Sequence, residues 1–203
     1  MKRARLQTRI MPPKTHQDLR PENLYDHLDR VLIDAETLLA RIAEMGTAIT
    51  TDFKGLPLTV VTILQGGAVF MADLIREIHL PMKLESISVA SYHGGTESSG
   101  TVTFHQNRLP DLNGRHVLVM DDILDSGRTL DAILRRFRDE CSPLSLRSCV
   151  LLSKKIDRAV PIEATYSGFD IENEFVVGYG LDYDGEYRNL PVIGVLKPEW
   201  IRS

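Results

Sequence analysis

The sequence lacks most features that mark membrane, secreted or nucleic-acid-binding proteins. No apolar run approaches the roughly 18 residues of a membrane-spanning helix, so we do not expect the chain to be an integral membrane protein. Only two cysteines occur among 203 residues, too few for a disulfide framework, which favours a reducing cytoplasm. The net charge of −4 gives no broad basic surface, so we do not expect nucleic-acid binding. Neither a Walker A loop nor a Rossmann glycine fingerprint is present, which excludes a dinucleotide-binding dehydrogenase.

The charge is unevenly distributed along the chain. Residues 1–20 contain six basic residues and one acidic residue, and we expect residues 1–25 to form a solvated, flexible tail. No linker divides the rest, so we expect one domain over residues 26–203. Its core would cover about residues 30–165, and a small hood would come from about residues 166–203 plus the N-terminal segment. The acidic body is compatible with a site that handles a polyphosphate through Mg²⁺.

Apolar periodicity predicts alternating strands and helices. Asp34 is a good N-cap for a helix over residues 34–53. We expect its buried stripe to contain Leu38, Leu39, Ile42, Met45, Ile49 and Phe53. Strands are predicted at residues 58–64, 86–92, 116–122 and 146–152, helices at 68–78 and 129–140, and short hood strands at 175–177 and 191–196. This order predicts an α/β fold with a mainly parallel central sheet flanked by helices.

The most informative segment is VLVMDDILDSGRTL, residues 117–130. An apolar strand ends in two carboxylates, Asp121 and Asp122, and a short loop then leads into a helix. The carboxyl ends of parallel strands bind ligands in open α/β sheets. The backbone N–H groups of the helix start, with Gly127 permitting close approach, can bind an anion, while adjacent carboxylates can accept hydrogen bonds from a sugar diol. Each feature alone is ordinary turn chemistry, but their order together predicts a ribose-phosphate site.

This segment resembles the phosphoribosyl-pyrophosphate motif of the type I phosphoribosyltransferases. Four further segments match the members of this family that act on 6-oxopurines, in the expected order: residues 64–74, 91–95, 151–155 and 174–191. The resemblance covers roughly residues 30–200. It implies the type I phosphoribosyltransferase fold, Mg²⁺ as cofactor, and transfer of the phosphoribosyl group to hypoxanthine or guanine in purine salvage. It also implies a homodimer or homotetramer.

The resemblance assigns the sugar and phosphate to the segment just described. Asp121 and Asp122 would hold the ribose hydroxyls and contribute to Mg²⁺ binding. The 5′-phosphate would be held by Asp125, Ser126, Gly127, Arg128 and Thr129. Asp125 would also exchange the purine N7 proton as general acid and base, and a neutral or shared proton on this carboxyl would relieve its repulsion of the phosphate.

The resemblance assigns the purine to segments further along the chain. Lys154 would donate to the purine O6, which favours a 6-oxo base over adenine because a lysine has donors and no acceptor. Phe175 would stack on the base, and the backbone of Val176 would contact the ring edge. Asp182 would lie at the base and bind Mg²⁺, and Arg188 would contact pyrophosphate.

Two further segments complete the implied site. Gln65 and Gly66 resemble a loop that binds pyrophosphate through its backbone and can contain a non-proline cis peptide. Gln65 stands where many relatives carry Lys or Arg, so we expect weaker pyrophosphate affinity. Ser91 and Tyr92, with the glycine-rich loop that follows, match a flap that covers the site and excludes water.

Two alternatives to this assignment stay open. One is an enzyme of the same class that prefers xanthine, or guanine over hypoxanthine. The other is a regulatory protein that binds phosphoribosyl pyrophosphate and contacts nucleic acid. Only the basic tail supports the regulator, whereas Lys154, Phe175, Asp182 and Arg188 argue against it.

Overall fold

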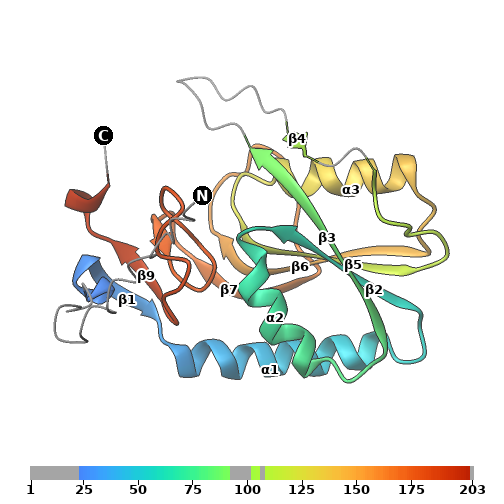
Figure 1. Cartoon of the computed structure of the whole chain (residues 1–203), viewed down its shortest axis with the longest axis horizontal. Helices are drawn as coiled ribbons and strands as arrows, with labels where there is room; N and C mark the ends of the chain where they lie inside the picture. Colours follow the sequence, from blue (N-terminus) through green and yellow to red (C-terminus); the bar gives the residue numbers. More distant parts are fainter. Residues whose placement is uncertain (1–22, 92–101, 106–107, 202–203) are drawn as a thin grey trace, which may run out of the picture.

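The computed structural model describes residues 23–91, 102–105 and 108–201, which form two sheets and flanking helices (Figure 1). The larger sheet has six strands in the order β4-β3-β2-β5-β6-β7, and all its pairs except β3/β4 are parallel. Its strands are β2 (Leu58–Leu64), β3 (Met82–Ser91), β4 (Val102–Phe104), β5 (His116–Leu124), β6 (Ser145–Lys154) and β7 (Tyr166–Ile171). The predicted mainly parallel α/β fold is therefore confirmed.

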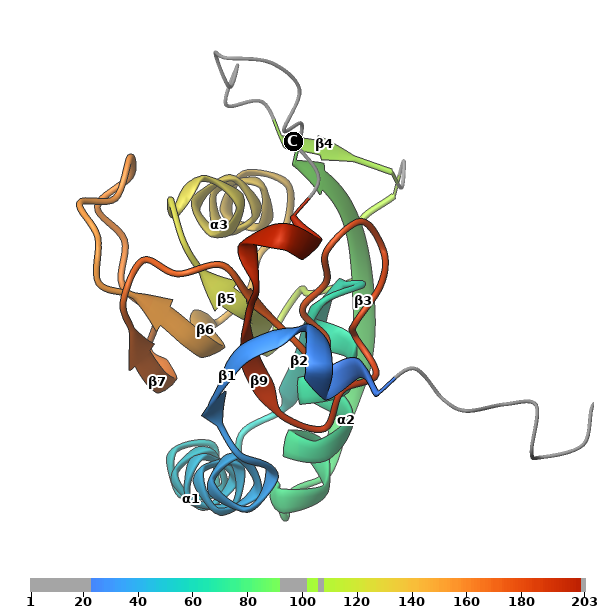
Figure 2. The ribbon, with the colours of Figure 1, turned by 90° about the vertical axis from the view of Figure 1, so that its left-hand side faces the viewer.

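Helices cover both faces of this sheet. Helix α1 (Ala35–Asp52) and helix α2 (Gly67–Glu77) lie on one face, and helix α3 (Arg128–Glu140) lies on the other (Figure 2). Strands β2 and β5 are buried almost throughout, as their continuous apolar sequences require. Two apolar clusters result, one beneath α1 and α2 and one beneath α3.

Helix α1 follows its predicted pattern with one exception. The side chain of Asp34 accepts a hydrogen bond from the backbone N–H of Thr37 at 2.8 Å, which makes it the N-cap. The predicted stripe from Leu38 to Phe53 is buried. The prediction that Leu39 widens this stripe is wrong, because its side chain is 53% exposed. The buried face is thus narrower than the sequence suggested.

The smaller sheet joins the two ends of the described chain. Its order is β1-β9-β8, formed by β1 (Leu28–Ile33), β9 (Ile193–Leu196) and β8 (Val176–Val177). Next to it lie the short 3₁₀ helices η1 (Leu24–His27) and η2 (Pro198–Trp200), where the His27 ring stacks on Trp200 at 3.6 Å. Strand β1 of the N-terminal part thus pairs directly with the C-terminal strand β9.

Three strands have no counterpart among the predicted elements: β1, β4 and β7. Strands β1 and β4 were not predicted, because β1 shows no regular alternation of burial and β4 has only three residues. Strand β7 contains a glycine and is mostly half-buried at the edge of the larger sheet. Because β7 belongs to that sheet, the smaller sheet takes its C-terminal strands from residues 176–196 and not from residue 166 onward.

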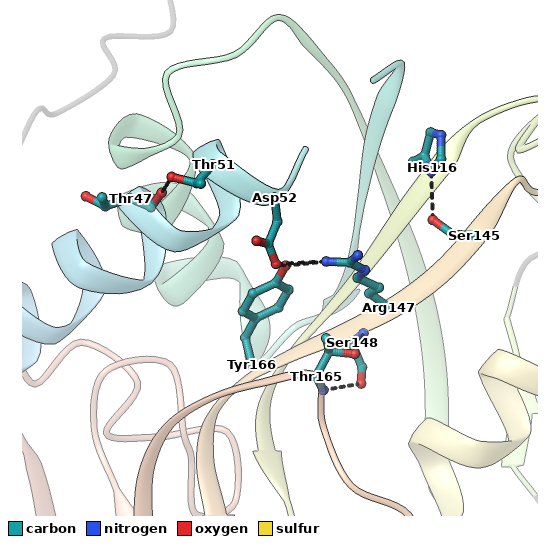
Figure 3. Close-up of polar contacts among 9 residues, drawn as sticks. All are labelled: Thr47, Thr51, Asp52, His116, Ser145, Arg147, Ser148, Thr165 and Tyr166. Atoms are coloured by element: carbon teal, nitrogen blue, oxygen red, sulfur yellow. Dashed lines mark hydrogen bonds and ion pairs between the residues drawn. The ribbon is translucent and has the colours of Figure 1, made fainter. Parts of the chain in front are cut away.

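Polar contacts fix the sheet at the starts of β6 and β7 (Figure 3). The hydroxyl of Tyr166, the first residue of β7, donates to the Asp52 carboxylate at 2.7 Å, and Arg147 of β6 pairs with the same oxygen at 2.9 Å. These contacts join the end of α1 to the strand starts. The opposite, carboxyl ends of the strands carry the predicted site. Among the described residues, no helix is long and apolar enough to span a membrane.

Candidate active site

The carboxyl ends of β5 and β6 bring Asp125 and Lys154 together. These strands are parallel neighbours, with Leu124 of β5 opposite Ser153 of β6, so the next residues emerge at one sheet edge. The Lys154 ammonium lies 3.1 Å from the Asp125 carboxylate and 3.5 Å from the side-chain oxygen of Asn173. The lysine side chain is only 12% exposed. Two residues assigned to the purine and its proton are therefore in direct contact.

The loop between β5 and α3 has the geometry of an anion site. Gly127 is the N-cap residue of α3 with φ of 81°, and no side chain caps the helix there. A Cβ at Gly127 would lie 2.7 Å from the carbonyl oxygen of Val160, so only glycine fits. The backbone N–H of Val160 donates to the Ser126 carbonyl at 3.1 Å, which supports the loop from behind. The helix begins at Arg128, one residue before the predicted start, and Thr129 follows in its first turn.

Asp121 and Asp122 lie inside β5, which runs two residues beyond the predicted strand end at Asp122. Asp121 is buried, and one of its oxygens accepts from the backbone N–H of Asp122 at 3.0 Å. Burial and the neighbouring Asp122 charge raise the pKa of Asp121 well above the usual carboxyl range. Burial also raises the pKa of Asp122, against the opposing effects of hydrogen bonds and the Arg188 charge. This pair of poorly solvated acceptors is suited to hydroxyl donors or a cation.

Two backbone segments meet in front of this pair. The peptide bond between Leu64 and Gln65 is cis, as the resemblance anticipated. A Cβ at Gly66 would lie 1.8 Å from a carboxylate oxygen of Asp122, so the loop before α2 lies directly against that side chain. Gly180, with φ of 101°, approaches from the hood, and a Cβ there would lie 2.3 Å from the Gly66 carbonyl oxygen. Both contacts require glycine, and Gln65 remains exposed.

The hood turn carries Asp182 and Arg188 to the same region. The Arg188 guanidinium pairs with the Asp182 carboxylate at 2.7 Å and donates to the Gly180 carbonyl at 2.6 Å. The second Asp182 oxygen accepts from the backbone N–H of Gly185 at 2.8 Å. Among the residues that the structure describes, no group of three acidic, histidine or cysteine side chains forms a metal cage. Asp182 therefore does not join Asp121 and Asp122 in one metal-binding cluster.

The remaining predicted residues lie at the border of the site. Phe175 is 45% exposed, and its ring packs edge-on against Tyr183 with centroids 5.4 Å apart. Val176 is buried in β8 opposite Val195 of β9. Ser91 is the last residue of β3, and Tyr92 lies outside the described residues with the predicted loop after it. The exposed face of Phe175 remains available for stacking.

Sequence reasoning missed residues that act on the predicted ones. Asn173 contacts Lys154, and Arg158 donates to the Ser153 hydroxyl at 2.7 Å and to the Lys154 carbonyl at 2.9 Å. Tyr179 in the hood donates to Asp73 of α2. No local pattern indicated these contacts, because each partner lies on another strand, helix or loop and is not set by a helix or strand period.

Comparison with known proteins gives one consistent family. The model of the phosphoribosyl transferase domain matches residues 29–184. The chain is 42% identical over 176 residues to the hypoxanthine-guanine phosphoribosyltransferase of Streptococcus pneumoniae, covering 87% of this chain and 97% of that protein. Against its counterpart from Mycobacterium avium the identity is 43% over 185 residues, with coverage of 88% and 91%.

A solved structure agrees with these sequences. The crystal structure of a hypoxanthine phosphoribosyltransferase from Staphylococcus aureus superposes with a TM-score of 0.85 at 41% identity, covering 91% of this chain and 100% of that one. The family model spans the sheet edge, the α3 loop and the turn at Asp182. The chain belongs to the phosphoribosyltransferase family.

Proposed function

We propose that this protein transfers the 5-phosphoribosyl group of phosphoribosyl pyrophosphate to a 6-oxopurine, hypoxanthine or guanine, and releases pyrophosphate. The products would be IMP and GMP, as purine salvage requires. The observation that carries this proposal is the contact between Lys154 and Asp125 at the head of α3. In this contact, a lysine that would donate to the purine oxygen lies beside a carboxylate that would accept the purine proton, next to the loop that would bind the phosphate.

The sugar phosphate would lie along the β5–α3 loop. Residues 125–129 would bind the 5′-phosphate through backbone N–H groups at the uncapped helix start. Asp121 and Asp122 would accept hydrogen bonds from the ribose hydroxyls. The raised pKa of Asp121 reflects burial first, and hydroxyl donors or a cation would offset that unfavourable burial of charge. The fixed pocket would hold the anomeric carbon in line with the attacking nitrogen.

The purine would lie between Phe175 and Lys154. The exposed ring of Phe175 offers a stacking surface, and the Val176 backbone would contact the base edge. Asp125 would exchange the N7 proton. The ion pair with Lys154 at 3.1 Å would orient the Asp125 carboxylate and partly offset its repulsion of the phosphate.

Mg²⁺ fits the donor set of the pyrophosphate half of the site. Mg²⁺ commonly uses one or two carboxylates together with substrate phosphates and waters, so a protein cage of three ligands is not needed. Because Asp182 does not cluster with Asp121 and Asp122, either Asp182 or the Asp121–Asp122 pair would supply the carboxylate ligands of one ion. Bound there, the ion would neutralise charge on the leaving pyrophosphate. Arg188 and the Gly66 backbone would bind pyrophosphate oxygens from the protein side.

The direct test supplies phosphoribosyl pyrophosphate, Mg²⁺ and one purine at a time, and follows nucleotide formation by absorbance. We expect activity with hypoxanthine and guanine, poor activity with xanthine, and none with adenine. Preference for xanthine would favour the first alternative. No nucleotide formation with any base, together with binding to DNA or RNA, would favour the regulatory protein.

A matched pair of lysine variants tests the assignment of the base. Lys154→Ala should lower kcat/KM for hypoxanthine roughly 10- to 100-fold, the effect of losing a charged hydrogen-bond donor. Lys155→Ala is the control, because Lys155 pairs with Glu172 and its side chain is 57% exposed. Equal activity of the two variants would remove Lys154 from the purine site.

We also propose a cytoplasmic location and a homodimer or homotetramer, both carried over from the family resemblance. Light scattering of the purified protein measures the oligomeric state, and a monomeric mass would contradict the second statement.

A further inference from the structure

Tyr179 occupies a backbone conformation that tyrosine rarely adopts. Its φ is 52°, and its neighbours Gly178 and Gly180 have φ of 98° and 101°, so three consecutive residues are left-handed. Such a conformation in a non-glycine residue persists where the surroundings enforce it. The Tyr179 side chain is only 5% exposed and packs in the cluster beneath α1 and α2. Its hydroxyl donates to the Asp73 carboxylate of α2.

This hydrogen bond connects the two segments assigned to pyrophosphate. On one side, α2 begins directly after Gln65 and Gly66, and Asp73 lies within the same helix. On the other side, Tyr179 immediately precedes Gly180, whose carbonyl accepts from Arg188 at 2.6 Å. The Gly180 backbone itself contacts the Gly66 carbonyl. A shift of Tyr179 relative to α2 would therefore change the distance between Gly66 and Arg188.

An ion pair and burial both stabilise the hydrogen bond between Tyr179 and Asp73. Asp73 also pairs with Arg76 one turn later, which holds the carboxylate in place on the helix. Burial and the Asp73 hydrogen bond raise the pKa of Tyr179, so the phenol remains a neutral donor across the working pH range. A protonated phenol and an oriented carboxylate form a strong, directional contact.

We propose that Tyr179 is a positioning residue that, through Asp73, fixes the Asp182–Arg188 turn against the Gly66 loop and thereby sets the affinity for the pyrophosphate group. This inference rests on the proposed function. Neither residue touches substrate in the assigned site. Their effect should fall mainly on the pyrophosphate half. The 5′-phosphate contacts and Lys154 come from β5, β6 and α3, and β8, which carries Val176, is held by its pairing with β9.

The test is Tyr179→Phe, which keeps the buried ring and removes only the hydroxyl. The KM for phosphoribosyl pyrophosphate, and that for pyrophosphate in the reverse reaction, should rise roughly tenfold, as on loss of a hydrogen bond to a charged group. The KM for hypoxanthine and the Kd for IMP should change less than about twofold. Combining Asp73→Asn with Tyr179→Phe should add little further, because both changes act on one contact.

Tyr166→Phe is the matched control, since it removes a phenol that also donates to an aspartate, at the far end of the sheet (Figure 3). It should leave the KM for phosphoribosyl pyrophosphate and the KM for pyrophosphate unchanged. An unchanged KM for phosphoribosyl pyrophosphate in Tyr179→Phe would overturn the inference, as would an equal rise in the hypoxanthine KM. Titration with pyrophosphate and Mg²⁺ makes the same comparison without turnover. If the wild type were inactive, the proposed function would be refuted. The titration would still show whether Tyr179→Phe weakens pyrophosphate binding.

Discussion

The contact between Gly66 and Asp122 allows a sharp test of how the site is built. In Gly66→Ala the new Cβ would lie 1.8 Å from a carboxylate oxygen of Asp122, whereas real Cβ contacts are essentially never shorter than 3.0 Å. The carboxylate or the loop must therefore move by more than 1 Å. The adjacent Gly67 provides the control, because its Cβ would meet nothing closer than 3.4 Å.

The size of the effect follows from this displacement. Overpacking of this kind costs about 1–3 kcal/mol, which lowers Tm by roughly 2–10 °C in a chain of this length. A displacement of about 1 Å in a positioned group can reduce turnover roughly 100-fold. Gly67→Ala should keep its activity. Its stability should be equal or higher by up to about 1 kcal/mol, because Gly67 is the first residue of α2 and alanine favours helix.

Thermal unfolding and steady-state kinetics of the two variants provide the measurement. A double variant identifies the colliding group. In the Asp122→Ala background, Gly66→Ala should cost little further stability, because the carboxylate that the new Cβ would meet is absent. If Gly66→Ala matched Gly67→Ala in Tm and turnover, the close approach would be wrong. If the loss persisted in the Asp122→Ala background, the clash would lie with another group.

Three further variants test the charges of the site. Asp125→Asn should reduce kcat roughly 100- to 10,000-fold while IMP binding, measured by calorimetry, stays nearly intact; near-normal turnover would remove Asp125 from the mechanism. Folding raises the pKa of Asp121 above its usual value of 3.8, so the wild-type protein loses folding stability as the pH rises above 3.8. Asp121→Asn should therefore be more stable than the wild type by about 1 kcal/mol at pH 8, and this advantage should disappear towards pH 4. Urea unfolding in the presence of EDTA measures the difference. The opposite pH trend would contradict the raised pKa. Gln65→Lys should lower the KM for phosphoribosyl pyrophosphate about fivefold at low salt and less at high salt, and no change would mean that the exposed position does not face the pyrophosphate.

The sequence predicted the elements whose patterns are strong. Helix α1 has a capping aspartate and a clear apolar period, and β2 and β5 are continuous apolar runs, so their existence followed from local chemistry. Strand β7 could not be found in this way, because an edge strand with a glycine has neither a long apolar run nor clear alternation. Its role depends on its parallel pairing with β6, which no local pattern encodes.

The contacts of the candidate site also differ in whether the sequence could predict them. The contact of Asp125 with Lys154 could be expected, because both follow strands that local patterns predicted and whose carboxyl ends lie side by side. The contact of Tyr179 with Asp73 could not, since the residues are 106 positions apart and, although both lie in segments that resemble the family, no local pattern pairs them. Three-dimensional packing alone brings such pairs together.

The geometry of Lys154 allows one step beyond the predicted role. An ammonium has three donors. One donor meets Asp125 at 3.1 Å and a second points towards Asn173 at 3.5 Å; no further acceptor for Lys154 occurs among the described residues, so the third donor could meet a purine oxygen. Lys154 would therefore bind a 6-oxo base without breaking its ion pair, and the pair would keep the Asp125 carboxylate oriented towards the base. If these roles hold, selection of the base and placement of the proton acceptor would both depend on Lys154 at the end of β6.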